Sequence, residues 1–417
     1  MPTFRRLFAL FIASLPCASL PASNVLASDI LYEEEFVFDP AVESHGHVHA
    51  SAIVQCPSGD LRVVWYENGP PLPSSRYYNE RKDKSADVRI GGSRKLKGAD
   101  AWEAPVVLSD TFGVSDNNPT MIIDASDRLW LIHPTMLGAP AWTWGSSVLR
   151  YRVSTDYQES AIPRWEQSNI LVPHPLGFEA VVDRLAERLE TEGPPPGLTR
   201  DRSRQYIEHM RQCLADPMKL RLGWMPRAHP LVRSDGTLVV PLSNENFSIA
   251  MMAMTSDGGR TWTYSDPVPD AGITQPSLVE FPDGRIQAYF RNSDPRHRIQ
   301  RSTSTDGGMT WSPLELTDRL HPGSGIEALL LENGHLALVY NNKEQSPRDK
   351  LAVSISDDGG QTWKWTRQLE DTPGGRFDYP SMIQATDGTV HVTYSYQLKT
   401  IKHARFNEAW VHQGHGS

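Results

Sequence analysis

The chain has 417 residues, a formal net charge of -9, 30 glycines and 32 prolines. This length suits one large domain or two ordinary ones, and the acidic balance argues against a nucleic-acid partner, because nucleic-acid-binding proteins are normally basic. Helical periodicity is scarce outside one segment while Gly and Pro are frequent, which is typical of an all-β protein with many short strands.

Residues 1–27 have the pattern of an export signal peptide. A basic start at Arg5 and Arg6 precedes an apolar run over residues 7–15, and a small-residue cleavage site ends at Ala27. The apolar run is too short to span a bilayer, so we expect a cleaved signal rather than a membrane anchor. The sequence therefore predicts a secreted or periplasmic protein with no integral membrane segment after signal removal.

Three copies of one short phrase occur in the second half of the chain. Each reads Asp-Gly-Gly-x-Thr-Trp, and the copies begin at Asp257, Asp306 and Asp358. The glycines can take positive φ, the Asp can accept hydrogen bonds from the turn, and the Trp is expected to fold back as an apolar plug. Copies spaced by about fifty residues indicate a repeat architecture.

The same layout accompanies each phrase: an apolar strand, a Gly-containing turn, a second strand, a loop and a third strand. Four antiparallel strands per repeat form the blade of a β-propeller, and degenerate copies bring the expected number of blades to six. Residues 30–38 would supply the outer strand of the last blade and so close the ring. The inner strands are expected at residues 49–54, 118–123, 229–232, 276–281, 326–331 and 379–384.

One segment, at about residues 177–217, has helical spacing instead of strand spacing. We expect a two-helix insertion between blades 2 and 3, acting either as a surface cap or as a lid over a central pocket. The rest of residues 28–410 would form one propeller, followed by a tail over residues 411–417. The apolar residues at helical spacing are Phe178, Val181, Val182, Leu185, Leu189, Tyr206, Ile207, Met210 and Leu214.

Two cysteines, Cys56 and Cys213, remain after the signal would be removed. They could form a disulfide only with their Cα atoms within about 7 Å of each other. Two free, buried thiols are the preferred expectation.

Polar side chains stand at the heads of the inner strands. In a propeller these strands converge on one face, where ligands tend to bind in a concavity. Any one such side chain could simply contact water in the axial channel. The prediction of a ligand site therefore rests on the whole ring of polar residues and not on a single position. The candidate residues at or near the strand heads are His49, Asn118, Arg227, His229, Gln275, Glu327 and Tyr379. Strand ends and loops add Asp83, Asp87, Glu245, Arg291 and Arg348.

Two of these candidates, Arg291 and Arg348, lie in equivalent parts of successive blades. A guanidinium offers a planar fork that matches a carboxylate, although solvated loop charge is the alternative interpretation. Cations near Tyr379 would lower the pKa of its phenol, because opposite charge favours the phenolate. Tyr379 is therefore a candidate nucleophile.

The repeats and the candidate residues resemble the sialidase (neuraminidase) superfamily, in particular bacterial BNR-repeat (Asp-box) sialidase-like proteins. The resemblance covers the mature chain and includes residues 222–230 and 401–410. It implies a six-bladed propeller and the hydrolysis of terminal sialic acids by a Tyr nucleophile, with a Glu that assists it, an Asp acid/base, three carboxylate-binding arginines and no cofactor. Such repeats identify the fold well and the reaction poorly.

Three positions match the pattern that the resemblance implies. Arg291, in Tyr-Phe-Arg-Asn, matches the second arginine, and Arg348 matches the third. Tyr379, in Asp-Tyr-Pro-Ser, matches the nucleophile. The acid/base has Asp83 and Asp87 as candidates.

Two positions depart from that pattern. His49 stands in the slot of the first arginine, and Gln275 stands in the slot of the assisting Glu. A neutral Gln cannot take a proton from a tyrosine, and the loss of one charged hydrogen bond to a carboxylate removes about 1.5–3 kcal/mol. A His can act as donor or acid/base near neutral pH. The site could therefore serve another glycan, such as a neutral sugar or a uronic acid.

His45, His47 and His49 alternate along the sequence. Alternate histidines on a strand can ligate a metal, but no carboxylate partner is evident, and no metal site is predicted.

Three functions remain open, all with a glycan or oligosaccharide as partner. The first is a secreted sialidase-like exo-glycosidase acting on terminal acidic sugars, with Tyr379 as nucleophile. The second is a propeller polysaccharide lyase or non-sialic glycosidase, with His49 or His229 as base and Tyr379 as acid. The third is a non-catalytic glycan-binding propeller.

Overall fold

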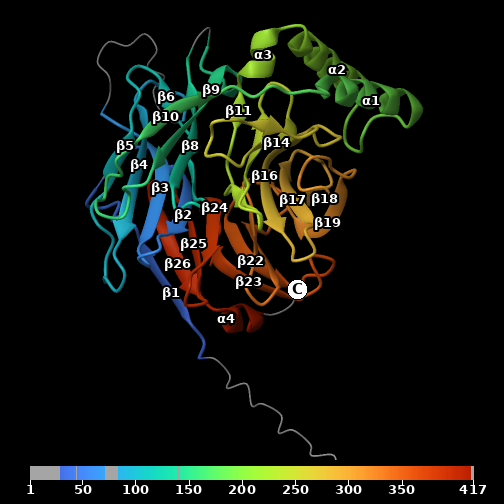
Figure 1. The fold of residues 1–417 in the computed structure, drawn as a ribbon. Coiled ribbons are helices and arrows are strands. Elements are labelled where there is room, and N and C mark those ends of the chain that lie inside the picture. The colour runs from blue at the N-terminus through green and yellow to red at the C-terminus, as the bar shows by residue number, and fades with distance from the viewer. Residues whose placement is uncertain (1–28, 44, 71–82, 139–140, 415–417) are drawn as a thin grey trace, which may run out of the picture.

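The computed structural model describes residues 29–43, 45–70, 83–138 and 141–414. These residues form six antiparallel sheets, the blades of a β-propeller (Figure 1). Inner strands of neighbouring blades pack side by side, and the inner strands of the first and last blades also touch, so the ring is closed. The six-bladed propeller predicted from the repeats is confirmed. The predicted signal peptide lies outside the described residues.

The first two blades have the predicted order from the inner to the outer strand. In blade 2 the inner strand is broken in two, because Asn118 lies between its halves with a left-handed φ of +35°. Blade 1 contains β2 (His49–Gln55), β3 (Leu61–Asn68), β4 (Val88–Lys95) and β5 (Val106–Ser109). Blade 2 contains β6 (Ser115–Asp116), β7 (Thr120–Ile123), β8 (Leu129–Met136), β9 (Ser147–Ser154) and β10 (Gln167–Leu171).

Blades 3 and 4 differ in their inner strands. The inner strand of blade 3 is again split, into two short strands that pair with opposite ends of β13. Blade 3 contains β11 (Trp224–Met225), β12 (Leu231–Val232), β13 (Leu238–Asn244), β14 (Ile249–Thr255) and β15 (Thr263–Tyr264). Blade 4 contains β16 (Ile273–Glu280), β17 (Ile286–Asn292), β18 (Arg298–Ser304) and β19 (Glu315–Leu320).

The last two blades complete the ring. Their central strands are buried on both faces, because each blade is packed between two others. Blade 5 contains β20 (Glu327–Leu330), β21 (Leu336–Asn341), β22 (Lys350–Ser356) and β23 (Trp365–Asp371). Blade 6 contains β24 (Phe377–Gln384), β25 (Val390–Tyr396), β26 (Thr400–Phe406) and, as its outer strand, β1 (Tyr32–Phe36).

The N-terminal strand β1 closes the propeller, as predicted. It pairs antiparallel with β26, from Tyr32 opposite Phe406 to Phe36 opposite Lys402. This pairing covers the otherwise open edge of the last blade. Glu35 on β1 also reaches the first blade, because both of its carboxylate oxygens accept hydrogen bonds from Lys95 Nζ, at 2.7 and 2.8 Å.

The three repeated phrases form identical turns. In each turn one carboxylate accepts hydrogen bonds from the amides three and four residues later and from the Thr hydroxyl. Both glycines of each phrase have positive φ, as predicted. The predicted plug is also observed, because the ring of Trp262 packs 5.7 Å from that of Tyr151 in the preceding blade, and Trp363 lies 6.4 Å from Tyr289. The turns therefore join neighbouring blades.

The predicted insertion contains α1 (Phe178–Thr191) and α2 (Arg200–Leu214), followed by the short α3 (Pro217–Arg221). The sequence analysis missed α3, because five residues are too few to display a helical period. The apolar sides of α1 and α2 join a hydrophobic core shared with blades 2 and 3. In Figure 1 these helices lie together at one end of the molecule.

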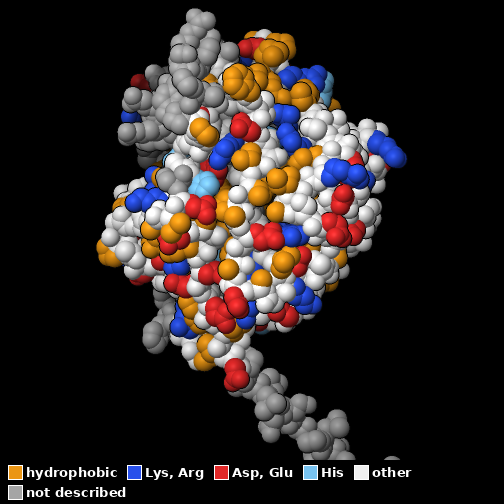
Figure 2. Space-filling view, turned by 90° about the vertical axis from the view of Figure 1, so that its left-hand side faces the viewer, with side chains coloured by type: hydrophobic (Ala, Val, Ile, Leu, Met, Phe, Trp, Pro, Cys, Tyr) orange, Lys and Arg blue, Asp and Glu red, His pale blue; other side chains and the backbone are white. Residues whose placement is uncertain are grey.

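Both remaining cysteines are free and buried, as expected, and they lie in separate hydrophobic clusters. After the last blade, α4 (Glu408–His412) packs back on the closing strand, with the Trp410 and Tyr32 rings stacked 4.4 Å apart. Across the described residues, no helix combines the length and apolar character needed to cross a membrane. Figure 2 shows one side of the molecule, on which acidic and basic side chains are interspersed rather than gathered by sign.

Candidate active site

A cavity of about 570 Å³ lies where the heads of the inner strands meet. Polar side chains dominate its wall, from blades 1 to 6. It brings together most of the residues that the sequence singled out. The predicted residues that line it are His49, Asp83, Asn118, Glu245, Gln275, Arg291, Arg348 and Tyr379.

The heads of the inner strands share an unusual backbone conformation. Gln275 and Tyr379 have φ values of +52° and +49°, and Ala50 has +59°, although none of them is a glycine. In each of these blades the strand pairing shifts register at this point, which marks a bulge. Left-handed non-glycine residues cost about 1–3 kcal/mol each, and such strain is concentrated at functional sites. The bulges turn the side chains of Gln275 and Tyr379 into the cavity.

The phenolic oxygen of Tyr379 lies among donors. NH1 of Arg291, at the end of β17, donates to it at 2.6 Å, and Nε2 of Gln275 donates at 3.4 Å. Guanidinium carbons of Arg291 and Arg348 each lie 5.9 Å from the centre of the phenol ring, and that of Arg227 lies at 4.8 Å.

These cations change the acidity of the phenol. Burial alone would raise the pKa of Tyr379, but the charges of Arg291 and Arg348 outweigh burial and lower it below its ordinary value. The sequence prediction of a phenol acidified by arginines therefore agrees with the geometry. A tyrosine in this state is a stronger nucleophile at neutral pH.

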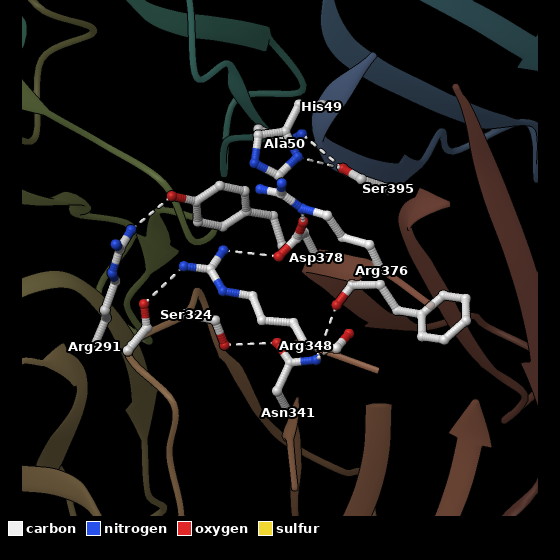
Figure 3. Close-up of polar contacts among 12 residues, drawn as sticks. His49, Ala50, Arg291, Ser324, Asn341, Arg348, Arg376, Asp378 and Ser395 are labelled. Carbon is white, nitrogen blue, oxygen red and sulfur yellow. Dashed lines mark hydrogen bonds and ion pairs between the residues drawn. The ribbon is translucent and has the colours of Figure 1, made fainter. Parts of the chain in front are cut away.

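A third arginine, Arg376, lines the same cavity and was missed by the sequence analysis. Its Nε donates to Asp378 Oδ2 at 2.5 Å, and NH1 of Arg348 donates to Asp378 Oδ1 at 2.7 Å. Asp378 is completely buried, whereas half of the Arg376 side chain is exposed. The guanidinium groups of Arg291, Arg348 and Arg376 are turned toward one space in Figure 3, which gives the cavity a cationic wall.

The signal for Arg376 was present in the sequence. Arg376 and Asp378 are two residues apart at the start of an inner strand, and side chains at that spacing share one side of an extended chain. Because of this spacing, the Arg-x-Asp pair just before Tyr379 could have been predicted as part of the site. The cavity also includes Trp144, in the 3-10 turn Trp144–Ser146, and His297, which the sequence analysis did not select.

His49, in the slot of the missing arginine, is a neutral neighbour of the nucleophile. Its ring centre lies 4.3 Å from that of Tyr379, and its Nδ1 is hydrogen-bonded to Ser395 Oγ at 2.9 Å. Burial, together with the charges of nearby histidine and arginine side chains, holds the pKa of His49 well below its usual range. The imidazole is therefore uncharged at neutral pH and adds no cation to the wall.

Two acidic side chains, Asp83 and Glu245, also line the cavity. The backbone of Asp83 is held by blade 2, since its carbonyl accepts hydrogen bonds from Asn117 Nδ2 at 2.8 Å and from Ser115 Oγ at 3.4 Å. Glu245 follows β13, and burial raises the pKa of its carboxyl group. The cavity wall thus holds carboxyl groups, which can exchange protons, as well as arginines.

Asp87, the other predicted acid/base, lies outside the cavity wall. Its carboxylate accepts hydrogen bonds from Ser85 Oγ and, at 3.3 Å, from Asn68 Nδ2. These contacts fix the start of β4 instead of facing a ligand. Of the two predicted acid/base candidates, Asp83 lines the cavity and Asp87 does not, and the identity of the proton donor stays a prediction.

Three predicted substrate-binding residues lie beneath the cavity rather than in its wall. Arg227 is buried under the Tyr379 ring and donates to the carbonyl oxygens of Ser51 and Pro380, at 3.2 and 2.7 Å. His229 and Glu327 are paired with each other, 3.4 Å apart. These three side chains do not line the cavity, and their role as substrate contacts stays a prediction.

The helical insertion stands beside the cavity rim. Tyr206 on α2 donates to the carbonyl of Phe247 at 2.9 Å, and Arg188 on α1 pairs with Asp270 at 3.0 Å, both next to rim loops. Within the described part of the chain, no residue of α1, α2 or α3 lines the cavity. This arrangement agrees with a cap that supports the rim loops rather than a lid that covers the cavity.

The alternating histidines have different partners, although the rings of His47 and His49 lie 5.6 Å apart. His45 pairs with Glu67 at 3.0 Å, while His49 turns to Ser395. Within the ranges that the structure describes, no group of three or more His, Cys, Asp or Glu side chains is placed to hold a metal ion.

Residues 210–392 match the model of the BNR repeat-like domain. The chain is similar to the sialidase of Micromonospora viridifaciens, with 27% identity over 39% of this chain and 26% of that protein. It is 23% identical to the sialidase of Bacteroides fragilis (strain YCH46), over 76% of this chain and 56% of that protein. The chain thus spans about a quarter and about half of these two relatives.

Among solved structures, the Hadza microbial sialidase Hz136 superimposes with a TM-score of 0.65 at 15% identity, over 91% of this chain and 69% of that chain. A likeness at this level of identity shows a shared propeller fold.

Proposed function

Because this chain is a BNR-repeat, sialidase-like six-bladed propeller, we propose that it is a secreted glycoside hydrolase that removes terminal acidic sugars from glycans. The observation that carries the proposal is the contact between Tyr379 and Arg291 in a cavity whose wall also holds Asp83. This combination supplies a nucleophile, a cation that stabilises its anionic form, and a proton donor. Export depends on the predicted signal peptide over residues 1–27.

The reaction proceeds in two steps. In the first, the Tyr379 oxygen forms a bond to the anomeric carbon of the terminal sugar, and the glycosidic bond breaks as Asp83 gives its proton to the departing oxygen. In the second, the Asp83 carboxylate takes a proton from a water molecule that attacks the same carbon. The Tyr379 oxygen then leaves with the electron pair. A tyrosine nucleophile avoids placing a carboxylate beside an acidic sugar.

The substrate carboxylate binds the cationic wall in this proposal. Arg291 and Arg348 match the arginines that the sequence resemblance implies, and Arg376 supplies the third cation that the slot of His49 lacks. The buried Asp378 holds Arg348 and Arg376 at a fixed separation. Charge-assisted hydrogen bonds from guanidinium groups are among the strongest polar contacts, so this wall supports selection of an acidic sugar.

A second candidate function is a polysaccharide lyase, favoured by one observation. The uncharged His49 lies against Tyr379, and a neutral imidazole beside a phenol can serve as a base and acid pair. A lyase would release an unsaturated sugar, whereas a hydrolase would not.

The test incubates the purified protein with sialosides, uronate polymers and neutral glycans. Free sialic acid, new reducing ends and the ultraviolet absorbance of unsaturated products are followed together. Release of sialic acid or another terminal acidic sugar supports the proposal, and an unsaturated product supports the lyase. Binding to a glycan without any product would contradict both and would support a non-catalytic propeller.

A further inference from the structure

Arg291 determines which way the side-chain amide of Gln275 points. A guanidinium nitrogen can only donate hydrogen bonds, and NH1 of Arg291 lies 3.3 Å from Gln275 Oε1. The carbonyl end of the amide is therefore occupied by Arg291. The amide nitrogen, Nε2, turns to the phenolic oxygen of Tyr379, 3.4 Å away.

The phenolic oxygen of Tyr379 consequently faces two donors and no acceptor among these partners. NH1 of Arg291 donates at 2.6 Å, and Nε2 of Gln275 completes the pair. Neither group can take up a proton at neutral pH. A neutral phenol would leave its own proton unmatched on this side, whereas a phenolate accepts both hydrogen bonds.

The charges that face Tyr379 come from several blades. Arg227 and Arg291 approach from blades 3 and 4, and Arg348 from the loop before β22. The carboxylate next to it, Asp378, is already paired with Arg348 and Arg376.

The other titratable groups around the cavity include His49, Tyr66, Glu245 and Asp83. His49 and Tyr66 on β2 and β3 stay uncharged, because burial lowers the pKa of His49 and raises that of Tyr66. Burial also raises the pKa of Glu245, while Asp83 lines the cavity, where its charge contributes to the raised pKa of Tyr66. The charges of Arg291 and Arg348 outweigh that of Asp378 in their effect on the pKa of Tyr379. Positive charge therefore prevails around Tyr379.

We propose that Gln275 is a positioning residue that holds Tyr379 as a phenolate before substrate binds, so that this chain needs no carboxylate base at position 275. The proposal rests on the function proposed above, in which Tyr379 is the nucleophile. The O–H bond of Tyr379 breaks with its electron pair left on oxygen, and the proton passes to bulk water through the open cavity. An assisting Glu would accept that proton during attack, whereas Gln275 stabilises the anion in advance.

The experiment is a spectroscopic titration of the full chain without substrate. The near-ultraviolet absorbance of phenolate is followed against pH in the wild type and in Tyr379→Phe, and the difference isolates Tyr379. We expect a midpoint below the ordinary tyrosine value of about 10. Gln275→Glu is expected to raise the midpoint by at least about one pH unit, because it replaces a donor with a negative charge.

Two further variants make the result specific. Gln275→Leu removes the donor without adding charge, and we expect a smaller rise of the midpoint. If a melting experiment shows that Gln275→Glu does not fold, the midpoint of Gln275→Leu alone tests the proposal. Gln212→Glu makes the same chemical change on the exposed part of α2 and is expected to leave the midpoint unchanged.

An unshifted midpoint in both variants of Gln275 overturns the proposal, whatever the turnover. A shifted midpoint in a protein that hydrolyses none of the glycans keeps the role of Gln275 and overturns only the proposed function. If turnover is present, the acidic limb of its pH profile should move up together with the midpoint in Gln275→Leu.

Discussion

The Arg376 guanidinium is bound to the Asp378 carboxylate, with 2.5 Å between Nε and Oδ2. The other oxygen of Asp378 accepts from Arg348 at 2.7 Å. One buried carboxylate therefore holds two of the three cavity arginines. Arg348 comes from blade 5, and Arg376 comes from the start of blade 6. This arrangement places a cation next to His49, at a point where the first blade provides none.

Removal of the Arg376 charge is expected to weaken binding of acidic substrates. We expect Arg376→Met to raise KM for an acidic sugar by about 10- to 100-fold, the equivalent of one charged hydrogen bond, with a smaller effect on kcat. The KM of Arg376→Lys should lie between those of the wild type and Arg376→Met. Steady-state kinetics on an acidic and a neutral substrate measure the effect. The exposed Arg260→Met is the control, and an equal loss on both substrates would contradict a role in binding the carboxylate.

Substitution of the nucleophile should stop the reaction. Tyr379→Phe keeps the ring among the arginines but removes the attacking oxygen, so we expect kcat to fall by roughly three orders of magnitude or more. The measurement is the rate of sugar release at saturating substrate. Tyr32→Phe removes a hydroxyl from the closing strand and should leave the rate unchanged. Undiminished release by Tyr379→Phe would exclude Tyr379 from the mechanism.

The two aspartates of the first blade should behave differently. Asp83→Asn is expected to lower kcat by about 10²- to 10⁴-fold on natural glycans, because it removes the proton donor. The loss should be much smaller on an aryl glycoside, whose leaving group needs no proton. Asp87→Asn, outside the cavity, serves as the matched control. Equal losses on both kinds of substrate would indicate that Asp83 is not the acid.

A fall in pH should weaken the attachment of β1, which closes the ring, because it protonates Glu35. Burial opposes ionisation, but hydrogen bonds from His403 and Lys95 lower the pKa of Glu35 to about 2. Because this value lies below the unfolded value of about 4.3, the stabilisation is complete above that pH and is lost as the pH falls toward 2. Glu35→Gln should lower the free energy of unfolding by about 1–3 kcal/mol at neutral pH.

Thermal melting across pH measures this effect, and the difference between Glu35→Gln and the wild type should shrink as the pH falls. Glu33→Gln on the same strand is the control, since its carboxylate is 61% exposed and should matter little. A difference that stays constant down to the lowest pH would show that the charge of Glu35 does not stabilise the closure.

Local patterns in the sequence were enough to predict the propeller. The phrase at Asp306 contains every group that its turn needs, and the strand and turn spacing repeats around the ring. Spacing also pointed to Gln275, Arg291 and Tyr379, because equivalent positions of successive blades converge on one face. Short elements such as α3, and the broken inner strands of blades 2 and 3, carry too few residues to show a period.

The tertiary structure decided which side chains share the cavity. Arg376 lines it next to the strand head where the register shifts at Tyr379, and Asp83, whose carbonyl oxygen accepts a hydrogen bond from Asn117 of blade 2, lines it whereas Asp87 does not. Arg227, a candidate from its place at a strand head, is held under the Tyr379 ring by contacts with strands of two other blades. The amino-acid sequence alone determined the repeated blades, since turns and strands depend on near neighbours along the chain. The composition of the site depends on contacts between residues hundreds of positions apart, and only the closed ring brings those residues together.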